Sequence, residues 1–419
     1  MADVQPLRAL HYDPAAAGSL DRLTAPPYDV IDAAKRRELA SRSPHNVVEI
    51  DLPSGDDPYG RAAELLDRWR LDGIVVRDEQ PALWALTQTY RLPDGRELVR
   101  RGFFARVRIT DYGAGHIRPH ERTHPAAKED RLKLMRATHA NLSPIFSLYP
   151  DPDQRAWSAL EQGTNAPPFG EVTDDEGTTH RMWRVADSEA LEQVHETLSS
   201  AELLIADGHH RYETARTYAE EVGGEGDHRY VLMYLVSMSD PGLTILATHR
   251  LVGNLDTDQR ARLERVLARD FSLTEVDADQ LEPLSSNGGL PSYGYLEAGG
   301  RRALRLQLNS GDAVERALAD HSESYRRLDT AVLEKLVLEE ALGFSEDDIS
   351  HQRGLAYARD LEETRALLSG GEYDLAFLLR PTPVEQVRAV AAAGETMPPK
   401  STYFYPKVLS GLLFNPLSG

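Results

Sequence analysis

Apolar residues recur every three or four positions in several stretches of the chain, which is the spacing of an amphipathic helix. One such stretch, 61–71, ends at Gly73, and another, 210–221, begins just after Gly208. A glycine at either end of a helix allows the sharp turn that starts or stops it. The pattern predicts helices at 61–71, 128–138, 189–198, 210–221 and 383–393.

Other stretches are apolar over short runs and are rich in residues that favour strands. Segments 82–91 and 98–109 flank Pro93-Asp94-Gly95, a turn sequence that predicts a hairpin. Residues 150–185 are rich in Pro, Gly, Asp and Thr, and we expect them to form an excursion or a hairpin. Further strands are predicted at 47–52, 143–148, 201–206, 230–238, 243–249 and 372–379.

Helices and strands are mixed along the chain, so the predicted fold class is α+β, that is, mixed α/β. A chain of 419 residues is expected to hold two or three domains, at roughly 100–200 residues each. We divide it into an N-terminal α/β region at 1–110, a core at 111–254 that carries the insertion near 150–185, and a C-terminal α/β region at 255–419 with a loop at 283–291.

The composition narrows the classes of partner. The formal net charge is -20, and such a surface repels DNA, RNA and anionic membranes, so nucleic acid is not an expected partner. The absence of cysteine excludes disulfides, zinc fingers, iron–sulfur clusters and cysteine nucleophiles. No signal sequence is recognised, and the longest apolar run, 230–238, is about half of the roughly 18 residues that span a bilayer. We expect a cytoplasmic protein without a membrane partner.

The main chemical signal is Asp207-Gly208-His209-His210-Arg211, which follows an apolar run and precedes a helical pattern. Gly208 lets the backbone turn sharply and lets a ligand approach closely. The first turn of the helix offers free N–H groups and the positive end of the helix dipole, which together favour an anion. His209, His210 and Arg211 add side-chain donors, and arginine can grip phosphate with two hydrogen bonds. The motif predicts a phosphate or nucleotide site; the alternative is a plain helix cap with solvated polar residues.

A second motif, His120-Glu121-x-x-His124, has the spacing of zinc peptidases. That chemistry needs both histidines on one face of an unbroken helix. Pro119 precedes the motif and Pro125 follows it, and a residue before proline is driven out of the helical region. His124 is therefore poorly placed as a metal ligand.

Glu121 is better interpreted as one ionised carboxylate among the surrounding cations. A glutamate of that kind beside a bound phosphate donor can act as a general base toward a hydroxyl group. The alternative is a salt-bridged surface segment. The cations near Glu121 in the sequence are Arg118, Arg122, Lys128 and Arg131.

Two further segments carry candidate ligand contacts. Asn141 and Ser143 lie between a predicted helix and a predicted strand, where they could bind a ligand or cap the helix. The C-terminal segment 397–407 combines lysines, prolines and three aromatics. Lys400 of this segment is predicted to reach the anion site; the alternative is a packed strand with exposed lysines. The chain lacks the P-loop, Rossmann and G-x-S-x-G patterns, so those sites are unsupported.

Several segments together resemble the bacterial and archaeal family catalogued as domain of unknown function 1015. The central region also resembles the ParB/sulfiredoxin-type fold of the free-serine kinases, which make O-phosphoserine from serine and ADP or ATP. Their motif order is matched by Ile117-x-Pro119-x-Glu121 followed by Asp207–Arg211. The segments that resemble the family are 25–31, 120–123 with Asp130-Arg131, 141–146, 205–212 and 399–407.

The resemblance implies a ParB/sulfiredoxin-like core with flanking α/β regions, and Mg²⁺ with ADP or ATP as cofactors. Glu121 would be the base on the serine hydroxyl. Asp207, as metal ligand, and His209 and His210 would act at the transferred phosphoryl group. The resemblance and the motifs above together give the candidate phosphate- or nucleotide-binding residues. These are Gly208, His209, His210, Arg211, Arg118, Thr123, Lys128, Arg131, Asn141, Ser143 and Lys400. The longer spacing between the motifs and the added flanking regions leave the acceptor open.

Three functions remain as hypotheses. The first is a free-serine-kinase-like phosphotransferase that acts on a small hydroxyl-bearing metabolite. The second is a nucleotide-binding switch with little or no hydrolysis. The third is a zinc metallohydrolase that uses His120 and His124. The expected partners are a nucleotide and the acceptor, L-serine being the candidate, and a homodimer is the candidate assembly.

Overall fold

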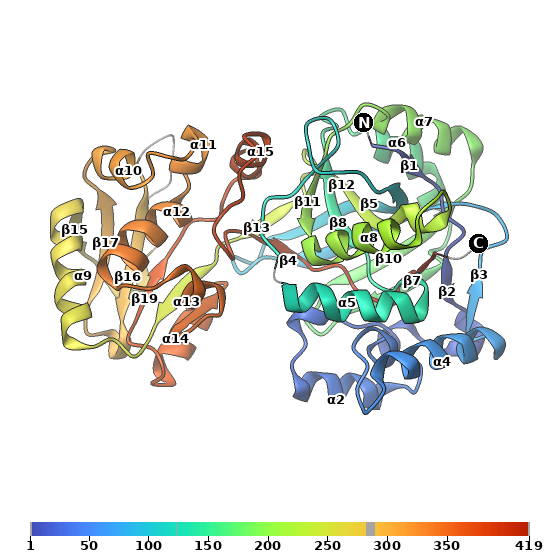
Figure 1. Ribbon diagram of the computed structural model, residues 1–419, viewed down its shortest axis with the longest axis horizontal. Coiled ribbons are helices and arrows are strands. Elements are labelled where there is room, and N and C mark those ends of the chain that lie inside the picture. Colours follow the sequence, from blue (N-terminus) through green and yellow to red (C-terminus); the bar gives the residue numbers. More distant parts are fainter. Residues whose placement is uncertain (1, 124, 282–289, 418–419) are drawn as a thin grey trace. The chain divides into compact units, whose positions relative to one another are not determined.

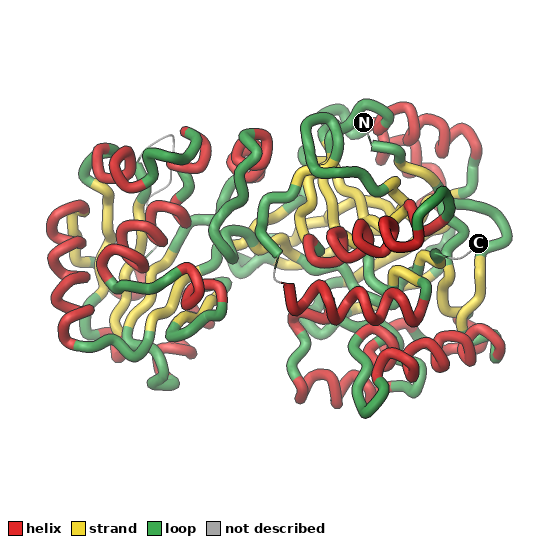
Figure 2. Tube along the Cα trace, in the orientation of Figure 1, coloured by secondary structure: helices red, strands yellow, loops and turns green. Residues whose placement is uncertain are grey.

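The computed structural model describes residues 2–123, 125–281 and 290–417. The chain forms two compact units. Unit 1 comprises residues 1–119, 123–243 and 406–419, and unit 2 comprises residues 120–122 and 244–405. The predicted loop at 283–291 falls largely outside the described residues. Figures 1 and 2 show helices and strands in both units, which confirms the predicted α+β class.

The described part of unit 1 is built on a nine-stranded mixed sheet in the order β6-β11-β8-β12-β5-β4-β10-β9, with β1 paired to β5. The pairs β11–β6 and β12–β8 are parallel, and the other pairs are antiparallel. The strands of this sheet are β1 Val4–Gln5, β4 Leu83–Arg91, β5 Glu97–Arg108, β6 Ile117–Arg118, β8 Ile145–Tyr149, β9 Gly170–Thr173, β10 Thr179–Val185, β11 Leu203–Asp207 and β12 Tyr230–Ser237. Two small antiparallel pairs lie apart from it: β2 Leu10–Tyr12 with β3 Val75–Arg77, and β7 Ala140–Asn141 with β21 Asn415–Pro416.

Helices of unit 1 pack on this sheet and on one another, and Figure 1 shows α8 crossing in front of the strands with α5 beside it. Side-chain caps start several of them; Asp187, for example, accepts a hydrogen bond from the Ala190 backbone at the start of α7. The α-helices are α1 Pro14–Ala17, α2 Ala33–Arg42, α3 Val48–Asp51, α4 Pro58–Leu71, α5 Pro125–Thr138, α6 Arg155–Glu161, α7 Ser188–Leu198 and α8 His209–Val222. Single 3₁₀ turns are η1 Leu20–Arg22, η2 Tyr28–Val30, η3 Gln162–Asn165 and η4 Asp227–Arg229.

The described part of unit 2 holds a six-stranded antiparallel sheet in the order β15-β17-β16-β19-β14-β18. Its strands are β14 His249–Val252, β15 Phe271–Glu275, β16 Ser292–Glu297, β17 Ala303–Leu308, β18 Leu355–Ala358 and β19 Leu375–Leu378, and β13 Thr244–Leu246 pairs separately with β20 Tyr403–Tyr405. Its helices are α9 Thr257–Asp270, α10 Asp312–Ala317, α11 Glu323–Arg326, α12 Asp329–Leu333, the π-helix η7 Glu334–Ala341, α13 Glu346–Ser350, α14 Leu361–Ser369 and α15 Val384–Ala392, with 3₁₀ turns η5 Ala278–Gln280 and η6 Ala298–Gly300.

Most of the predicted elements are confirmed, but two of the predicted strands are wrong. The strand predicted at 47–52 is the short helix α3, because the Asn46 side chain accepts a hydrogen bond from the Val48 backbone and starts a turn there. The strand predicted at 243–249 is divided between β13 and β14, which join different sheets. Thr248, which lies between them and in neither ladder, donates its hydroxyl to the Lys400 carbonyl at 2.5 Å.

The division into two units differs from the predicted three regions. The hairpin β4–β5, from the predicted N-terminal region, pairs with β10 on one side and β12 on the other. The predicted excursion at 150–185 contains β9 and β10, so it also belongs to this sheet. Hydrogen bonds between strands that are distant in the sequence therefore join residues across the predicted boundary between 1–110 and 111–254. No helix of the described residues combines the length and apolar character needed to cross a bilayer.

Candidate phosphate-binding site

The turn between β11 and α8 has the backbone geometry that the Asp207-Gly208 motif predicts. Strand β11 is buried up to Ala206, and helix α8 begins at His209. Gly208 takes φ 97° and ψ 28°, which is the left-handed region that favours glycine. A Cβ at this position would lie 3.1 Å from the Arg211 guanidinium. The dihedral angles of the turn therefore favour glycine, and a larger residue would also shift the Arg211 guanidinium by a few tenths of an ångström.

Asp207 holds two cations of unit 1. Its Oδ1 lies 2.7 Å from Lys407 Nζ, and its Oδ2 lies 2.6 Å from an Arg211 guanidinium nitrogen. Burial alone would raise the pKa of Asp207, but Lys407, Arg211 and His209 lower it well below its usual range. The carboxylate is therefore ionised at neutral pH, and the positive charges of Lys407 and Arg211 balance its negative charge.

Arg211 is largely enclosed and also donates to the Pro144 carbonyl. Burial would lower its pKa, but the Asp207, Asp29 and Asp51 carboxylates and Tyr28 raise it, so the guanidinium stays charged. The predicted phosphate-binding arginine thus has two protein partners, and a phosphate would exchange with one of them or use its remaining donors.

A second group of side chains lines a small cavity of about 30 Å³ next to Arg211, roughly the volume of one water molecule. Asp51 is one of the lining residues: it accepts from Ser143 Oγ at 2.7 Å, and its Oδ1 is 3.4 Å from an Arg131 nitrogen. The cavity brings together four of the predicted binding residues, Arg131, Asn141, Ser143 and Arg211.

Tyr28 completes the surroundings of Arg131. The Arg131 guanidinium lies 4.2 Å from the centre of the Tyr28 ring, a cation–π contact. Burial raises the pKa of Tyr28 to about 12, while Arg211 and Arg131 lower it and Asp29 and Asp51 raise it. The phenol is therefore neutral and can act as a hydrogen-bond donor.

Asn141 has a structural role in this arrangement. Its Oδ1 accepts from the Leu232 backbone at 3.1 Å and from Asn415 Nδ2 at 2.9 Å. It thereby joins β12 to the β7–β21 pair. Its side-chain oxygen is occupied, which leaves its Nδ2 group as the donor toward the cavity.

The other predicted cations of unit 1 contact acidic side chains. Arg118 Nε donates to Glu202 at 3.1 Å. Thr123 Oγ1 and Lys128 Nζ both bind Glu213, on α8, at 2.7 and 2.8 Å. Thr123 and Lys128 are therefore tied to the same helix that carries Arg211, at a residue two positions after the motif.

Two predicted site residues, Glu121 and Lys400, belong to unit 2. Glu121 Oε1 lies 4.0 Å from Nε2 of His120, which is fully buried and hydrogen-bonded to Thr402 Oγ1 at 3.0 Å. Lys400 is exposed and has the positive φ of 56°. Within unit 1, the lysine of the C-terminal segment that contacts Asp207 is Lys407.

The side chains that could donate to a metal ion give little support to the predicted Mg²⁺ and zinc sites. No three His, Asp or Glu side chains among the described residues are arranged to hold a metal ion. His124, the second histidine of the zinc motif, lies outside the described residues. Both oxygens of Asp207 already accept from cations, so the chain by itself does not form a Mg²⁺ site there. Mg²⁺ commonly binds through one or two carboxylates together with substrate phosphates.

Several residues of this site carry little or no local sequence signal: Tyr28, Asp29, Asp51, Glu213 and Lys407. The pattern around Asp51 predicts a strand, which conceals its role, and Lys407 is 200 residues from its partner Asp207. The sequence Pro26-Pro27-Tyr28-Asp29 is the one local signal, since a rigid turn can fix a side chain at a cleft.

Together, the fold and site define an α+β protein with a glycine turn, a helix start and three cations gathered at one place. The chain belongs to the family described as protein of unknown function DUF1015, which it matches over residues 4–331. No curated protein sequence matches the chain.

Solved structures similar to the chain include a free serine kinase in complex with AMP, with 13% identity and a TM-score of 0.36 over 69% of this chain and 83% of that one. A conserved hypothetical protein from Pyrococcus furiosus has 14% identity and a TM-score of 0.34 over 69% and 86%. SbnI with a C-terminal truncation, from Staphylococcus aureus, has 14% identity and a TM-score of 0.34 over 70% and 82%.

Proposed function

We propose that this protein is a nucleotide-dependent phosphotransferase that binds the phosphates of ADP or ATP at the start of α8. The observation that carries the proposal is the pairing of Lys407 and Arg211 with Asp207 at the Gly208 turn, with Arg131 lining the cavity that Arg211 also lines. Helix starts of this kind bind anions through backbone N–H groups, and arginine adds donors with a geometry that suits phosphate. The acceptor would be a small hydroxyl compound such as free L-serine, as the resemblance to free-serine kinases implies.

In this proposal the chain acts mainly by positioning and charge stabilisation. Arg211 and Lys407 would hold phosphate oxygens, and His209 and His210, at the start of α8, would contact the transferred group. Glu121 would accept the proton of the acceptor hydroxyl. Mg²⁺, when bound with the nucleotide, would offset phosphate charge. Asp207 would hold it through Oδ1, once a phosphate has taken Lys407 from that oxygen.

One observation favours a second candidate, a nucleotide-binding switch with little turnover. Asp207 is already paired with Lys407, which lies in the segment where the chain returns from unit 2 to unit 1. A phosphate that takes Lys407 as its partner would release this ion pair. Binding alone could thus change how the C-terminal segment is held.

The deciding experiment is phosphorus NMR of the full chain with Mg²⁺, ADP or ATP, and free serine. The phosphotransferase predicts a new phosphomonoester signal that requires serine. Glu121→Gln should abolish the signal while nucleotide binding remains, and Glu129→Gln, in an exposed pair with Lys133, should leave it unchanged. Nucleotide binding without any phosphomonoester would reject serine phosphorylation and favour the switch.

The binding step has its own test by calorimetry. Arg211→Met should weaken nucleotide binding by about tenfold or more, because a charged hydrogen bond to phosphate is lost. Arg216→Met, on the same helix but paired with the exposed Asp111, is the matched control. Equal nucleotide affinity of the two variants would show that the start of α8 is not the phosphate site.

A further inference from the structure

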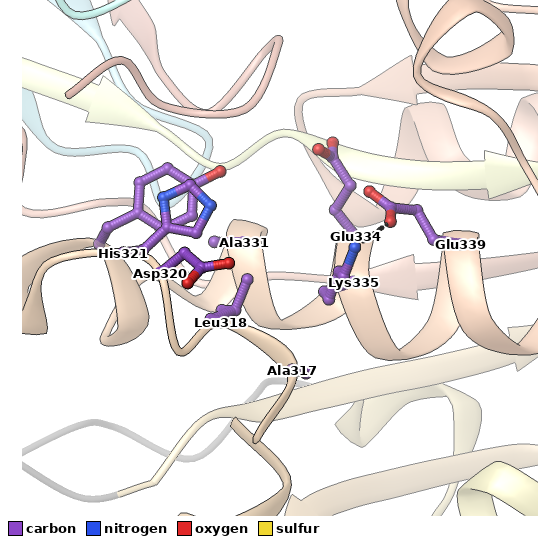
Figure 3. Close-up of a pocket in the computed structure, with 9 residues that line it drawn as sticks. Ala317, Leu318, Asp320, His321, Ala331, Glu334, Lys335 and Glu339 are labelled. Atoms are coloured by element: carbon purple, nitrogen blue, oxygen red, sulfur yellow. Dashed lines mark hydrogen bonds and ion pairs between the residues drawn. The ribbon is translucent and has the colours of Figure 1, made fainter. Parts of the chain in front are cut away.

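A cavity of about 160 Å³ lies within unit 2, and none of the proposed phosphate-binding residues lines it. It is lined by the end of α10, the segment before α11, and the junction of α12 with the π-helix η7 (Figure 3). Its volume corresponds to roughly five water molecules, enough for a small metabolite. π-helical turns occur frequently at functional sites, and η7 begins at Glu334, one of the lining residues.

The lining is strongly polar and carries excess negative charge. Three of its side chains are carboxylates, Asp320, Glu334 and Glu339. Lys335 Nζ is 2.6 Å from Glu339 Oε2 and neutralises that carboxylate, as the dashed line in Figure 3 marks. The charges of Asp320 and Glu334 remain without an ion-pair partner among the described residues.

Glu334 is the most enclosed of these carboxylates, and its environment disfavours a bare negative charge. Burial raises its pKa to about 7; Arg250 lowers the pKa, and Glu339 and Glu346 raise it. Arg250 directs its own hydrogen bonds to Thr248 and the Pro399 carbonyl. Within the described chain the Glu334 carboxylate accepts no hydrogen bond, so it is available to a ligand donor.

An aromatic pair forms the other side of the cavity. His321 and Tyr325 stack with ring centres 3.9 Å apart and planes at 10°. His321 Nδ1 is held by Glu395 Oε1 at 2.8 Å, which fixes the orientation of the pair. Figure 3 shows the His321 ring across the cavity from Glu334 and Glu339. An aromatic ring beside carboxylates is a favourable environment for an organic cation.

We propose that this cavity binds a small organic ammonium compound, with the Glu334 carboxylate accepting hydrogen bonds from the ammonium group and Tyr325 packing beside it. A divalent metal ion is disfavoured, because the described residues offer no metal-holding group of three such ligands. The proposal rests on unit 2 alone and is independent of the proposed phosphotransfer.

The test uses ethanolamine as the cationic probe and ethylene glycol as its uncharged counterpart, both titrated into the full chain by calorimetry. Ethanolamine should bind and ethylene glycol should not. Glu334→Gln, which keeps the shape and removes the charge, should weaken ethanolamine binding by about tenfold. Glu340→Gln, on the same helix but paired with Arg269, is the matched control and should bind as the wild type does.

Equal binding of ethanolamine by the wild type and Glu334→Gln, or equal binding of both probes by the wild type, would overturn the proposal. If Glu334→Gln does not fold, the comparison of the two probes on the wild-type chain decides by itself. Failure of this test leaves the serine-dependent phosphorus signal untouched, so the two proposals stand or fall separately.

Discussion

At the scale of single residues, the chain places an ionised carboxylate among cations at the end of a buried strand. The Asp207 carboxylate is neutralised by Lys407 and Arg211, at 2.7 and 2.6 Å. Removing one member of such a pair leaves an incompletely compensated buried charge, which costs more than the pair contributes. This makes the Asp207–Lys407 contact the most sensitive polar interaction of the candidate site.

Lys407→Met should therefore lower the free energy of unfolding by about 2–3 kcal/mol at neutral pH, measured by urea denaturation. The pKa of Asp207 is lowered in the folded chain, so the stability it contributes is present above its ordinary pKa and is lost as pH falls. The cost of Lys407→Met should accordingly shrink in acid. Lys133→Met, in an exposed pair with Glu129, should cost less than about 1 kcal/mol; a similar cost for both would contradict the assignment.

The second residue-scale prediction concerns Gly208. Gly208→Ala should destabilise the chain by about 1–2 kcal/mol, since alanine is strained at φ 97°. It should also weaken nucleotide binding, because the new Cβ would press on the Arg211 guanidinium. Gly177→Ala is the matched control: φ is 81° and the space is open, so the stability cost should be similar while nucleotide affinity stays unchanged. Unchanged affinity in both variants would separate this turn from the phosphate site.

At the scale of elements, β14 and β19 in unit 2 are joined by a histidine as well as by their ladder. His249 Nδ1 accepts from the Leu379 backbone N–H at 3.1 Å, which requires that nitrogen to carry no proton. Burial, with the neighbouring Arg250, lowers the pKa of His249 to about 4, from an ordinary value of 6.5. The folded chain thus keeps this imidazole neutral where an unfolded chain would protonate it.

Stability of these strands should fall as pH drops from 6.5 to about 4, by roughly 2–3 kcal/mol in total, because the unfolded state binds the proton more readily. Hydrogen exchange of the β14 and β19 amides would follow this loss. His249→Gln should flatten the pH dependence of the exchange, whereas His351→Gln, at an exposed position, should preserve it. The same slope in wild type and His249→Gln would rule out this histidine as the cause.

At the scale of the whole molecule, each unit has a hydrophobic core of its own. Unit 1 buries a large cluster around its nine-stranded sheet, and unit 2 buries a smaller one under β14, β16 and β19. The two proposed ligands are assigned to different units, so their effects can be followed separately. A ligand that binds only the folded state stabilises it by RT ln(1 + L/Kd), where L is the free ligand concentration.

Hydrogen exchange of the full chain should resolve the two sites. Saturating ADP is expected to slow exchange in β11 and α8, and ethanolamine is expected to slow it in η7. At about one hundred times Kd, each ligand would add about 2.7 kcal/mol to the stability of the state that it binds. Protection of the same peptides by both ligands would contradict two independent sites.

Local patterns predicted a good part of this fold. Helical periodicity located α4, α5, α7, α8 and α15, and apolar runs located the β4–β5 hairpin, β8, β11, β12 and β19. The Asp-Gly sequence after an apolar strand also predicted the β11–α8 turn, since only glycine adopts that turn without strain. These features depend on residues close together in the chain, and such residues follow propensity and periodicity.

Local order in the sequence thus predicts the α+β class and the position of the glycine turn, and motifs spread along the chain indicate the family. Tertiary structure decided which side chains meet there: Lys407 comes to Asp207 from 200 residues away, and Asp51 joins Arg131 and Ser143 through a helix where a strand was predicted. It also assigned Glu121 to unit 2, although Pro119 and Thr123 on either side belong to unit 1. Burial and charge in the folded chain decide which distant segments pair. A short stretch of neighbouring residues carries no information about either.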